Sequence, residues 1–285
     1  MRVANYDSIA AAYDRRYGLH EYAGVRRSLL NFLSAGSPVA SVLEVGCGTG
    51  HWLAALQARL KPSPDDDDGS ATASAERHPS PDVRSAKASA DRRILAGVEP
   101  SSQMIARARI AAPGARLVRG CAEALPWADA TFDRVCCINA LHHFTDRAQF
   151  FAEALRILRP GGGLLTIGKD PHADQDAWWV YDYFPETVGI DRQRFARVRT
   201  LRGEMAAAGF AWAESHQSDH IEALMPATEA LASGVVDRAY TSQLAVLSEE
   251  ELASGIARLR AANAAAGDEL QLVTDFRLYA TIGWV

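Results

Sequence analysis

Apolar residues along the chain gather in short unbroken runs that alternate with segments of helical spacing. The short runs predict buried strands at 41–45, 94–98, 115–118, 132–139 and 163–168. The other segments predict helices at 20–35, 49–60, 101–111 and 145–158, the last ended by Pro160, Gly161 and Gly162. Strands that alternate with helices need crossover connections, so this pattern predicts a mostly parallel sheet with helices on both faces.

The second part of the chain has a different pattern. Residues 192–209 have helical spacing, and 210–221 and 271–284 predict two late strands. The residues between them, 226–267, are rich in alanine and helical in pattern. We therefore expect an α/β fold with a doubly wound, mostly parallel, seven-stranded, Rossmann-like sheet. Its late strands would be antiparallel and would carry a helical cap over one end.

One segment does not fit this alternation. Residues 62–92 are rich in Pro, Ser and Asp, and Val83 is their only large apolar residue. Such a composition buries too little apolar surface to offset the entropy lost on ordering. It predicts a disordered surface insertion, with a docking or regulatory loop as the functional alternative.

A glycine-rich turn follows the first predicted strand, in the sequence Glu44-Val45-Gly46-Cys47-Gly48-Thr49-Gly50. Glycine adopts positive φ and lets a ligand approach the backbone, and doubly wound sheets bind ligands at this edge. The dinucleotide fingerprint requires glycine at position 51, where this chain has His51. An acid two residues before the first glycine repels a pyrophosphate but suits a cation such as a sulfonium. The turn therefore indicates S-adenosylmethionine rather than NAD.

The composition of the chain disfavours several other classes of protein. The formal net charge of −5 disfavours nucleic acid as the main partner, because no basic balance exists to neutralise phosphates. The first ten residues contain no apolar run, so we expect no signal peptide, and no segment approaches the roughly 20 apolar residues of a membrane span. The four cysteines contain no C-x-x-C pair, which predicts neither a disulfide framework nor a zinc site and fits a cytoplasmic location.

Several further motifs follow one another in a recognisable order. They are Tyr6-Asp7-Ser8-Ile9-Ala10 with Tyr13-Asp14, the glycine-rich turn, Val98-Glu99-Pro100-Ser101 with Met104, Ala122-Glu123-Ala124-Leu125-Pro126 before Phe132-Asp133, and Leu158-Arg159-Pro160-Gly161-Gly162. From Tyr6 to Gly168 the chain resembles a class I S-adenosylmethionine-dependent methyltransferase of the methyltransferase type 11 group. The branch it resembles contains the ubiquinone and menaquinone biosynthesis methyltransferases.

The resemblance implies an organisation and a set of cofactor contacts. It implies an N-terminal helical lid at 1–40, a methyltransferase core at 41–223, a helical cap at 224–269 and a last core strand at 270–285. Glu99 would accept both ribose hydroxyls, and Glu44 with Gly46 would hold the methionine ammonium. Cys121 stands where relatives often have an Asp for the adenine amino group. The expected cofactor-binding residues are Tyr13, Glu44, Gly46, Cys47, Gly48, Thr49, Gly50, Glu99, Pro100, Met104, Cys121, Ala122, Glu123 and Asn139.

A base for the acceptor is expected after the fourth strand. His142 and His143 follow Asn139 there, and histidine titrates near neutrality, so both are candidate catalytic bases. The alternative is a packing role for the pair. No third ligand lies at local spacing, so no metal is expected. His172, after the fifth strand, is a second candidate base.

Two other groups of residues allow two interpretations each. Five aromatics lie between Trp178 and Phe184, and they predict either a wall of an apolar substrate pocket or the core of the cap. Five arginines, Arg192, Arg194, Arg197, Arg199 and Arg202, predict either a solvated helix face or a docking site for an anionic group or carrier protein.

The function that these features favour is methyl transfer from S-adenosylmethionine to an O, N or C atom of a small-molecule metabolite. The alternatives are a methyltransferase acting on protein or RNA and a non-catalytic module that binds the cofactor. A dehydrogenase is a further rival that NAD binding would reveal. No pattern indicates a membrane partner or a particular oligomeric state.

Overall fold

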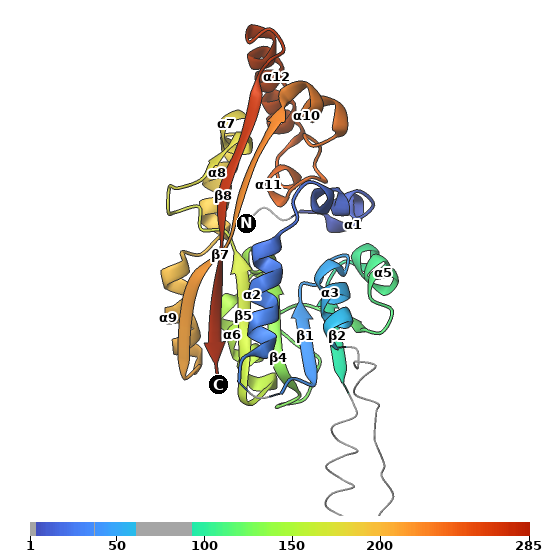
Figure 1. Cartoon of the computed structure of the whole chain (residues 1–285), viewed down its shortest axis with the longest axis vertical. Helices are drawn as coiled ribbons and strands as arrows, with labels where there is room; N and C mark the ends of the chain where they lie inside the picture. Colours follow the sequence, from blue (N-terminus) through green and yellow to red (C-terminus); the bar gives the residue numbers. More distant parts are fainter. Residues whose placement is uncertain (1–3, 37, 61–92) are drawn as a thin grey trace, which may run out of the picture.

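A computed structural model describes residues 4–36, 38–60 and 93–285 of the chain. The insertion expected at 62–92 lies outside the described residues. The described residues form a sheet flanked by helices, with the N-terminal segment beside one end of the sheet and the last strand lying one place in from an edge (Figure 1). None of the described helices has the length and apolar character needed to cross a membrane.

The sheet has eight strands in the described residues, one more than predicted. They are β1 (Ser41–Val45), β2 (Ile94–Glu99), β3 (Arg116–Arg119), β4 (Phe132–Ile138), β5 (Leu158–Gly168), β6 (Ala177–Trp178), β7 (Trp212–Pro226) and β8 (Gln271–Trp284). Their order is β3-β2-β1-β4-β5-β8-β6, with β7 paired to β8. The pairs among β1 to β5 are parallel, and those of β8 are antiparallel. The extra strand, β6, has only two residues and leaves too short a pattern for the sequence to reveal.

Helices cover both faces of this sheet. They are α1 (Tyr6–Ile9), η1 (Tyr13–Gly18), α2 (Ala23–Ser34), α3 (His51–Leu60), α5 (Ser102–Ala111), η3 (Leu141–His143), α6 (Arg147–Ile157), α7 (Trp179–Tyr183), α8 (Glu186–Arg194), α9 (Val198–Ala208), α10 (Ala227–Ser233), α11 (Ser242–Ala245) and α12 (Glu249–Ala265). Neighbouring residues of a strand point to opposite faces. Val42 therefore packs in one core with α2 and α3, whereas Leu43 packs in another with α6 and α9.

The late strands form a long antiparallel ribbon that carries the cap. β7 and β8 pair from Trp212↔Trp284 to Pro226↔Gln271, so they extend well beyond the ends of the parallel strands. The three helices α10 to α12 follow at the far end of this ribbon, next to α7 and α8 (Figure 1). They lie within residues 224–269, the segment expected to form a cap.

Several element boundaries differ from the prediction, among them the end of β7 at Pro226, five residues beyond the predicted strand, and the junction of α6 with β5. The helix predicted at 145–158 ends at Ile157, and β5 begins at Leu158 and includes Pro160. The pairing of β4 and β5 shifts register beside this segment, so the Pro-Gly-Gly sequence is accommodated within the sheet edge and not in a loop.

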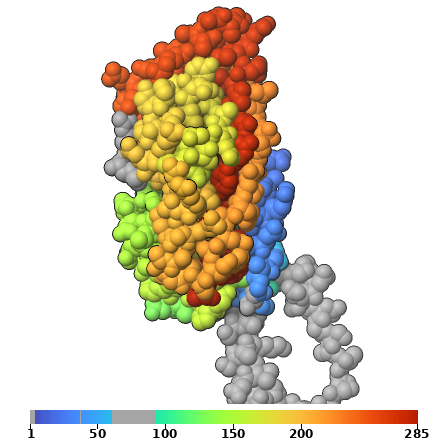
Figure 2. Space-filling view, turned by 90° about the vertical axis from the view of Figure 1, so that its left-hand side faces the viewer, coloured from blue at the N-terminus to red at the C-terminus, as the bar shows by residue number. Residues whose placement is uncertain are grey.

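The helix predicted at 192–209 is two helices, α8 and α9. Phe195 separates them with an extended backbone, and its ring is buried against the ring of His142. The five arginines therefore do not share one helix face: Arg194 is buried in an ion pair with Asp191, whereas Arg197 is exposed. Figure 2 shows the yellow and orange residues of α7 to α9 together on one face, below the orange-red residues of the cap.

We predict opposite effects for two helical Gly→Ala substitutions. A Cβ on Gly255 of α12 would lie 2.0 Å from the buried ring of Phe184, whereas one on Gly203 of α9 meets no atom within 4 Å. Gly255→Ala should lower the free energy of unfolding by about 1–3 kcal/mol through overpacking. Gly203→Ala should raise it by about 0.5–1 kcal/mol through helix propensity. Urea denaturation measures both, and a neutral Gly255→Ala would show that the cap is not packed tightly on α7.

Candidate active site

The largest described cavity that contains the glycine-rich turn has a volume of about 560 Å³. It lies at the carboxyl ends of β1, β2 and β4, and the N-terminal segment forms one of its walls. This volume is in the range of small-molecule sites. The residues predicted to bind the cofactor that line it are Tyr13, Glu44, Gly46, Cys47, Gly48, Thr49, Glu99, Pro100, Met104, Cys121, Ala122, Glu123 and Asn139.

The glycines of the turn have different surroundings. All three have positive φ: 72° at Gly46, 52° at Gly48 and 86° at Gly50. A Cβ on Gly46 would lie 2.4 Å from the Cβ of Ala140, and one on Gly50 would lie 2.9 Å from the Cα of Ala108. Gly50, expected to bind the cofactor, does not line the cavity and instead lets α3 pack on α5. Gly48 has free space beside its backbone, because the atom nearest to the position of an added Cβ is 3.8 Å away, on Tyr13.

The carboxylate of Glu99 is held at the end of β2. One oxygen accepts the backbone N–H of Gly48 at 3.1 Å, and the other accepts that of Ser101 at 3.0 Å. Burial raises the pKa of Glu99, and these two hydrogen bonds oppose the shift. Each oxygen keeps a further lone pair. The carboxylate is therefore oriented before any ligand arrives and can accept two hydroxyl groups.

Glu44 is a second carboxylate in the same cavity, and it is 1 % exposed. One of its oxygens, Oε2, is buried and has no hydrogen-bond partner among the described residues. Burial, and next the proximity of Glu99, raise the pKa of Glu44 well above its usual value. An unpartnered buried oxygen is costly, so this position favours a ligand that brings a hydrogen-bond donor or a positive charge.

The far end of the cavity contains the predicted adenine contacts. The side chain of Ser101 caps α5 by accepting the N–H of Met104, which fixes the buried methionine against the cavity. Glu123 accepts hydrogen bonds from the N–H and the hydroxyl of Thr145, so its carboxylate holds the loop after β4 in place. The thiol of Cys121 is exposed at the cavity wall.

The N-terminal segment is tied over the cavity by three polar contacts. Asp7 accepts the hydroxyl of Ser101 at 2.5 Å, and Asp14 accepts that of Thr49 at the same distance. The Tyr6 hydroxyl lies 2.6 Å from Nε2 of His143. These contacts connect the segment to β2, the glycine-rich turn and the loop after β4, so it closes the cavity as a lid.

The two candidate bases occupy different places. His143 lines the large cavity, whereas His142 does not. His142 is buried, stacks on Phe195 at a centroid distance of 4.0 Å and lies 3.2 Å from the hydroxyl of Ser242. Burial lowers the pKa of both rings, that of His143 to about 3, so both are neutral near pH 7. His172, the other candidate, contacts the carbonyl of Phe195 and lines neither cavity of the site.

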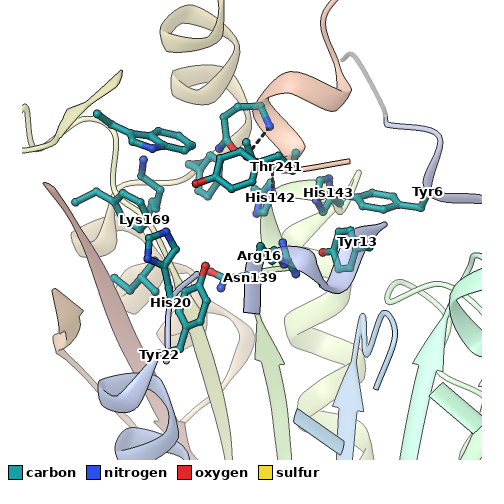
Figure 3. Close-up of a pocket in the computed structure, with 17 residues that line it drawn as sticks. Tyr6, Tyr13, Arg16, His20, Tyr22, Asn139, His142, His143, Lys169 and Thr241 are labelled. Atoms are coloured by element: carbon teal, nitrogen blue, oxygen red, sulfur yellow. Dashed lines mark hydrogen bonds between the residues drawn. The ribbon is translucent and has the colours of Figure 1, made fainter. Parts of the chain in front are cut away.

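A second, smaller cavity of about 80 Å³ adjoins the first (Figure 3). The two share Tyr6, Tyr13, Arg16, Asn139 and His143. The other lining residues come from the segment before α2, from η3, from the end of β5, from β6 and β8, from the break between α8 and α9 and from the cap: His20, Tyr22, His142, Lys169, Trp178, Phe195, Tyr240, Thr241, Ser242, Gln243, Phe276 and Leu278. The shared residues place the second cavity where a molecule could reach a ligand held in the first.

The aromatic residues between Trp178 and Phe184 do not share one role: one of them lines the smaller cavity, and others belong to the core of the cap. Trp178 lines the smaller cavity, whereas Trp179 and Phe184 are buried in the core beneath the cap. The two roles alternate because Trp178 belongs to β6 and Trp179 begins α7, which turns successive side chains in different directions.

Several residues of the site were not singled out from the sequence. Arg16 and Lys169 line one or both cavities, and Ser242 with Gln243 reaches the smaller one from the cap. The motifs Tyr6-Asp7 and Tyr13-Asp14, which precede Arg16, were the available signal for the segment expected to act as a lid. No sequence signal pairs the cap with the lid, because more than 200 residues separate them.

One group of possible metal ligands occurs in the described residues, at His220, Glu222 and Asp275. It lies on the β7–β8 ribbon, and both ring nitrogens of His220 face carboxylates while Arg277 also contacts Asp275. These contacts form a network of ion pairs outside the two cavities.

Comparison with known proteins identifies the fold. Residues 79–166 match the family model of a methyltransferase domain, a match that starts after the glycine-rich turn. A phthiotriol/phenolphthiotriol dimycocerosates methyltransferase of Mycobacterium ulcerans is 37% identical over 91 residues, which are 32% of this chain and 33% of that protein. Over residues 79–166 the chain is therefore similar to methyltransferases.

Two further similarities agree with this methyltransferase assignment. The ubiquinone/menaquinone biosynthesis C-methyltransferase UbiE of a Marinomonas species is 33% identical over 95 residues, or 32% of this chain and 38% of that protein. A crystal structure from Anabaena variabilis, described as a methyltransferase of an antibiotic biosynthesis pathway, superposes with a TM-score of 0.61 at 21% identity and covers 90% of this chain and 95% of that one. The chain spans about a third of the length of the curated relatives it matches. The resemblance noted from the sequence is thereby confirmed.

The low pKa of His143 predicts a pH dependence of the stability of this protein. Its folded-state pKa, about 3, lies below the usual value of 6.5, so the unfolded chain binds the proton more tightly. The resulting stability is present above pH 6.5 and is lost as the pH falls toward 3, by up to about 1.4 kcal/mol per pH unit.

His143→Gln should therefore make the free energy of unfolding less sensitive to pH between 6 and 4, as measured by urea denaturation at several pH values. The matched control is His216→Gln, because His216 is exposed on β7. Parallel pH profiles for the wild type and His143→Gln would contradict a neutral, buried His143.

Proposed function

We propose that this protein transfers the methyl group of S-adenosylmethionine to an O, N or C atom of a small molecule with an apolar portion. The observation that carries the proposal is the pair of adjoining cavities that share Tyr6, Tyr13, Asn139 and His143. The larger would hold the cofactor and the smaller the acceptor. Transfer of an activated methyl group mainly needs alignment of the two reactants and exclusion of water, which such an arrangement supplies.

The residues of the larger cavity fit the cofactor. Glu99 offers two oriented oxygens to vicinal hydroxyls, and Gly48 leaves the backbone open to a ligand. The unpartnered Oε2 of Glu44 suits the ammonium of an amino acid. Met104 and Ala122 would contact the adenine, with Cys121 in place of a carboxylate. The bound cofactor would supply an electrophilic methyl group, and the chain would supply its position and its dry surroundings.

We propose His143, rather than His142, as the base where the acceptor carries a proton. It lies on the wall between the cavities, is neutral near pH 7, and has its ring fixed by the hydroxyl of Tyr6 at 2.6 Å. His142 is held behind it by Ser242 and Phe195 and would support its position. Both rings could instead only shape the pocket, and kinetics separates these roles.

A small acceptor is favoured over a macromolecular one. The N-terminal segment is hydrogen-bonded over the larger cavity through Asp7 and Asp14, and Gln243 of the cap, which lines the smaller one, reaches Asp191 of α8 at 2.7 Å. These contacts leave little room for a large acceptor. A non-catalytic binding module would not require the second cavity. The expectation that nucleic acid is not the main partner and the expectation of a cytoplasmic location stay predictions.

The cofactor assignment predicts the effect of removing the carboxylate of Glu99. Glu99→Gln should weaken binding of S-adenosylhomocysteine by roughly tenfold or more, since hydrogen bonds to a charged acceptor contribute about 1.5–3 kcal/mol. Isothermal titration calorimetry measures the affinity. Glu229→Gln, on the exposed side of α10, is the control and should bind as the wild type does. Wild-type protein that fails to bind the compound would refute the proposal.

The base assignment predicts that turnover and affinity respond differently. With an acceptor found by screening metabolites for release of S-adenosylhomocysteine, His143→Ala should lower kcat by about 10²-fold or more and change cofactor affinity little. Tyr6→Phe should lower kcat less, because the ring of His143 keeps its other contacts. Equal kcat in His143→Ala and the wild type at all pH values would rule out the base.

A further inference from the structure

The two cavities differ in the charge of the side chains that line them. Asp7, Glu44, Glu99 and Glu123 line the larger one, with Arg16 as its only cation among the described residues. The smaller one is lined by Arg16 and Lys169, and no Asp or Glu belongs to its described lining. The larger cavity therefore favours a cation, and the smaller one favours an anion.

Lys169, which lines the smaller cavity, and Arg194, which lies behind its Phe195 wall, are buried cations that already have acidic partners. Nζ of Lys169 lies 3.5 Å from Oδ2 of Asp176 and 4.0 Å from the ring centre of Trp178. Arg194 pairs with Asp191 at 2.6 Å. Each of these pairs has no net charge. The net charge at the smaller cavity therefore depends on whether Arg16 has an acidic partner.

Arg16 has no carboxylate within ion-pair distance among the described residues. Its guanidinium lies 3.8 Å from the ring centre of Tyr13, and Nη2 donates to the hydroxyl of Tyr17 at 3.0 Å. Its Nε is buried and has no hydrogen-bond partner in the described structure. The aromatic rings and the tyrosine hydroxyl hold a guanidinium in place while leaving donors unused.

Arg16 lies where these donors can reach the smaller cavity, which is proposed to hold the acceptor. In Figure 3 the side chain lies beside Asn139 and below His142, in the middle of the lining residues of the smaller cavity. A guanidinium matches the two oxygens of a carboxylate or a phosphate. The walls facing it are aromatic, from Tyr22, Trp178, Tyr240 and Phe276.

We propose that the acceptor is a small aromatic or similarly apolar compound with a carboxylate or phosphate group, and that Arg16 binds this group. The proposal rests on the proposed function, because it takes the smaller cavity as the acceptor site. The cavity of about 80 Å³ has room for roughly six waters, which is the size of an anionic head group with part of a ring. Arg16 would thereby determine specificity by charge from its place in the lining that the two cavities share.

Direct binding tests this proposal without knowledge of the natural acceptor. The protein saturated with S-adenosylhomocysteine is titrated with benzoate, phenyl phosphate and the neutral analogue benzamide, and chemical-shift changes are followed by NMR. Benzoate or phenyl phosphate should bind at least about tenfold more tightly than benzamide, as a charge-assisted hydrogen bond implies. The tighter of the two anions identifies the preferred group.

Variants of Arg16 separate its roles. Arg16→Gln should abolish the preference for the anions, and Arg16→Lys should retain part of it because the charge stays while the planar fork is lost. The titrations use S-adenosylhomocysteine at concentrations that saturate each variant, so a change in cofactor affinity is measured separately from the anion preference. Arg199→Gln, an exposed position on α9, is the matched control and should keep the full preference.

Three outcomes would overturn the proposal. One is equal affinity of the wild type for benzoate and benzamide, and another is no binding of any of the probes to the loaded protein. The third is a large loss of S-adenosylhomocysteine affinity in Arg16→Gln with the anion preference unchanged, which would assign Arg16 to the cofactor's own carboxylate. Failure of the wild type to bind S-adenosylhomocysteine is a different result, because it would refute the proposed function itself.

Discussion

The structure of the site depends on two carboxylates buried at the ends of adjacent parallel strands, Glu44 on β1 and Glu99 on β2. Burial is unfavourable for both, as their raised pKa values show. Glu99 is stabilised by the N–H groups of Gly48 and Ser101, so the carboxylate that faces the ligand also fixes the turn and the start of α5. Glu44 keeps an unpartnered oxygen, which makes a positively charged ligand part of the energetics of this cavity.

The charge of the site reverses over a short distance. The larger cavity is lined by four acids, the smaller one by none of the described acids, and the two share Tyr6, Tyr13, Arg16, Asn139 and a neutral His143. A sulfonium and an anionic acceptor would each be attracted to its own cavity. Asn139 takes a positive φ of 52° there, a conformation that Asn tolerates better than most residues and that is frequent at functional sites.

The cap reaches the smaller cavity because β7 and β8 form a long antiparallel ribbon. β7 and β8 continue beyond the parallel strands and return the chain above α7 and α8, where Asp191 joins three elements (Figure 1). It accepts the hydroxyl of Tyr181, the amide of Gln243 and the guanidinium of Arg194. Such a fully buried acid links the cap to the core by directional bonds, so cap and pocket form one unit.

The sequence by itself determined the alternation of strands and helices, because buried parallel strands and amphipathic helices leave strong local patterns. The glycine-rich turn and the acid ending β2 were equally local, so most residues that line the larger cavity could be named from the sequence. Only the tertiary structure decided that Gly50 packs on Ala108, that 192–209 breaks at Phe195, and that Arg16, Lys169 and Gln243 meet in one cavity. These outcomes depend on contacts between residues far apart in the chain, and the preference of a single residue for helix or strand carries no information about them.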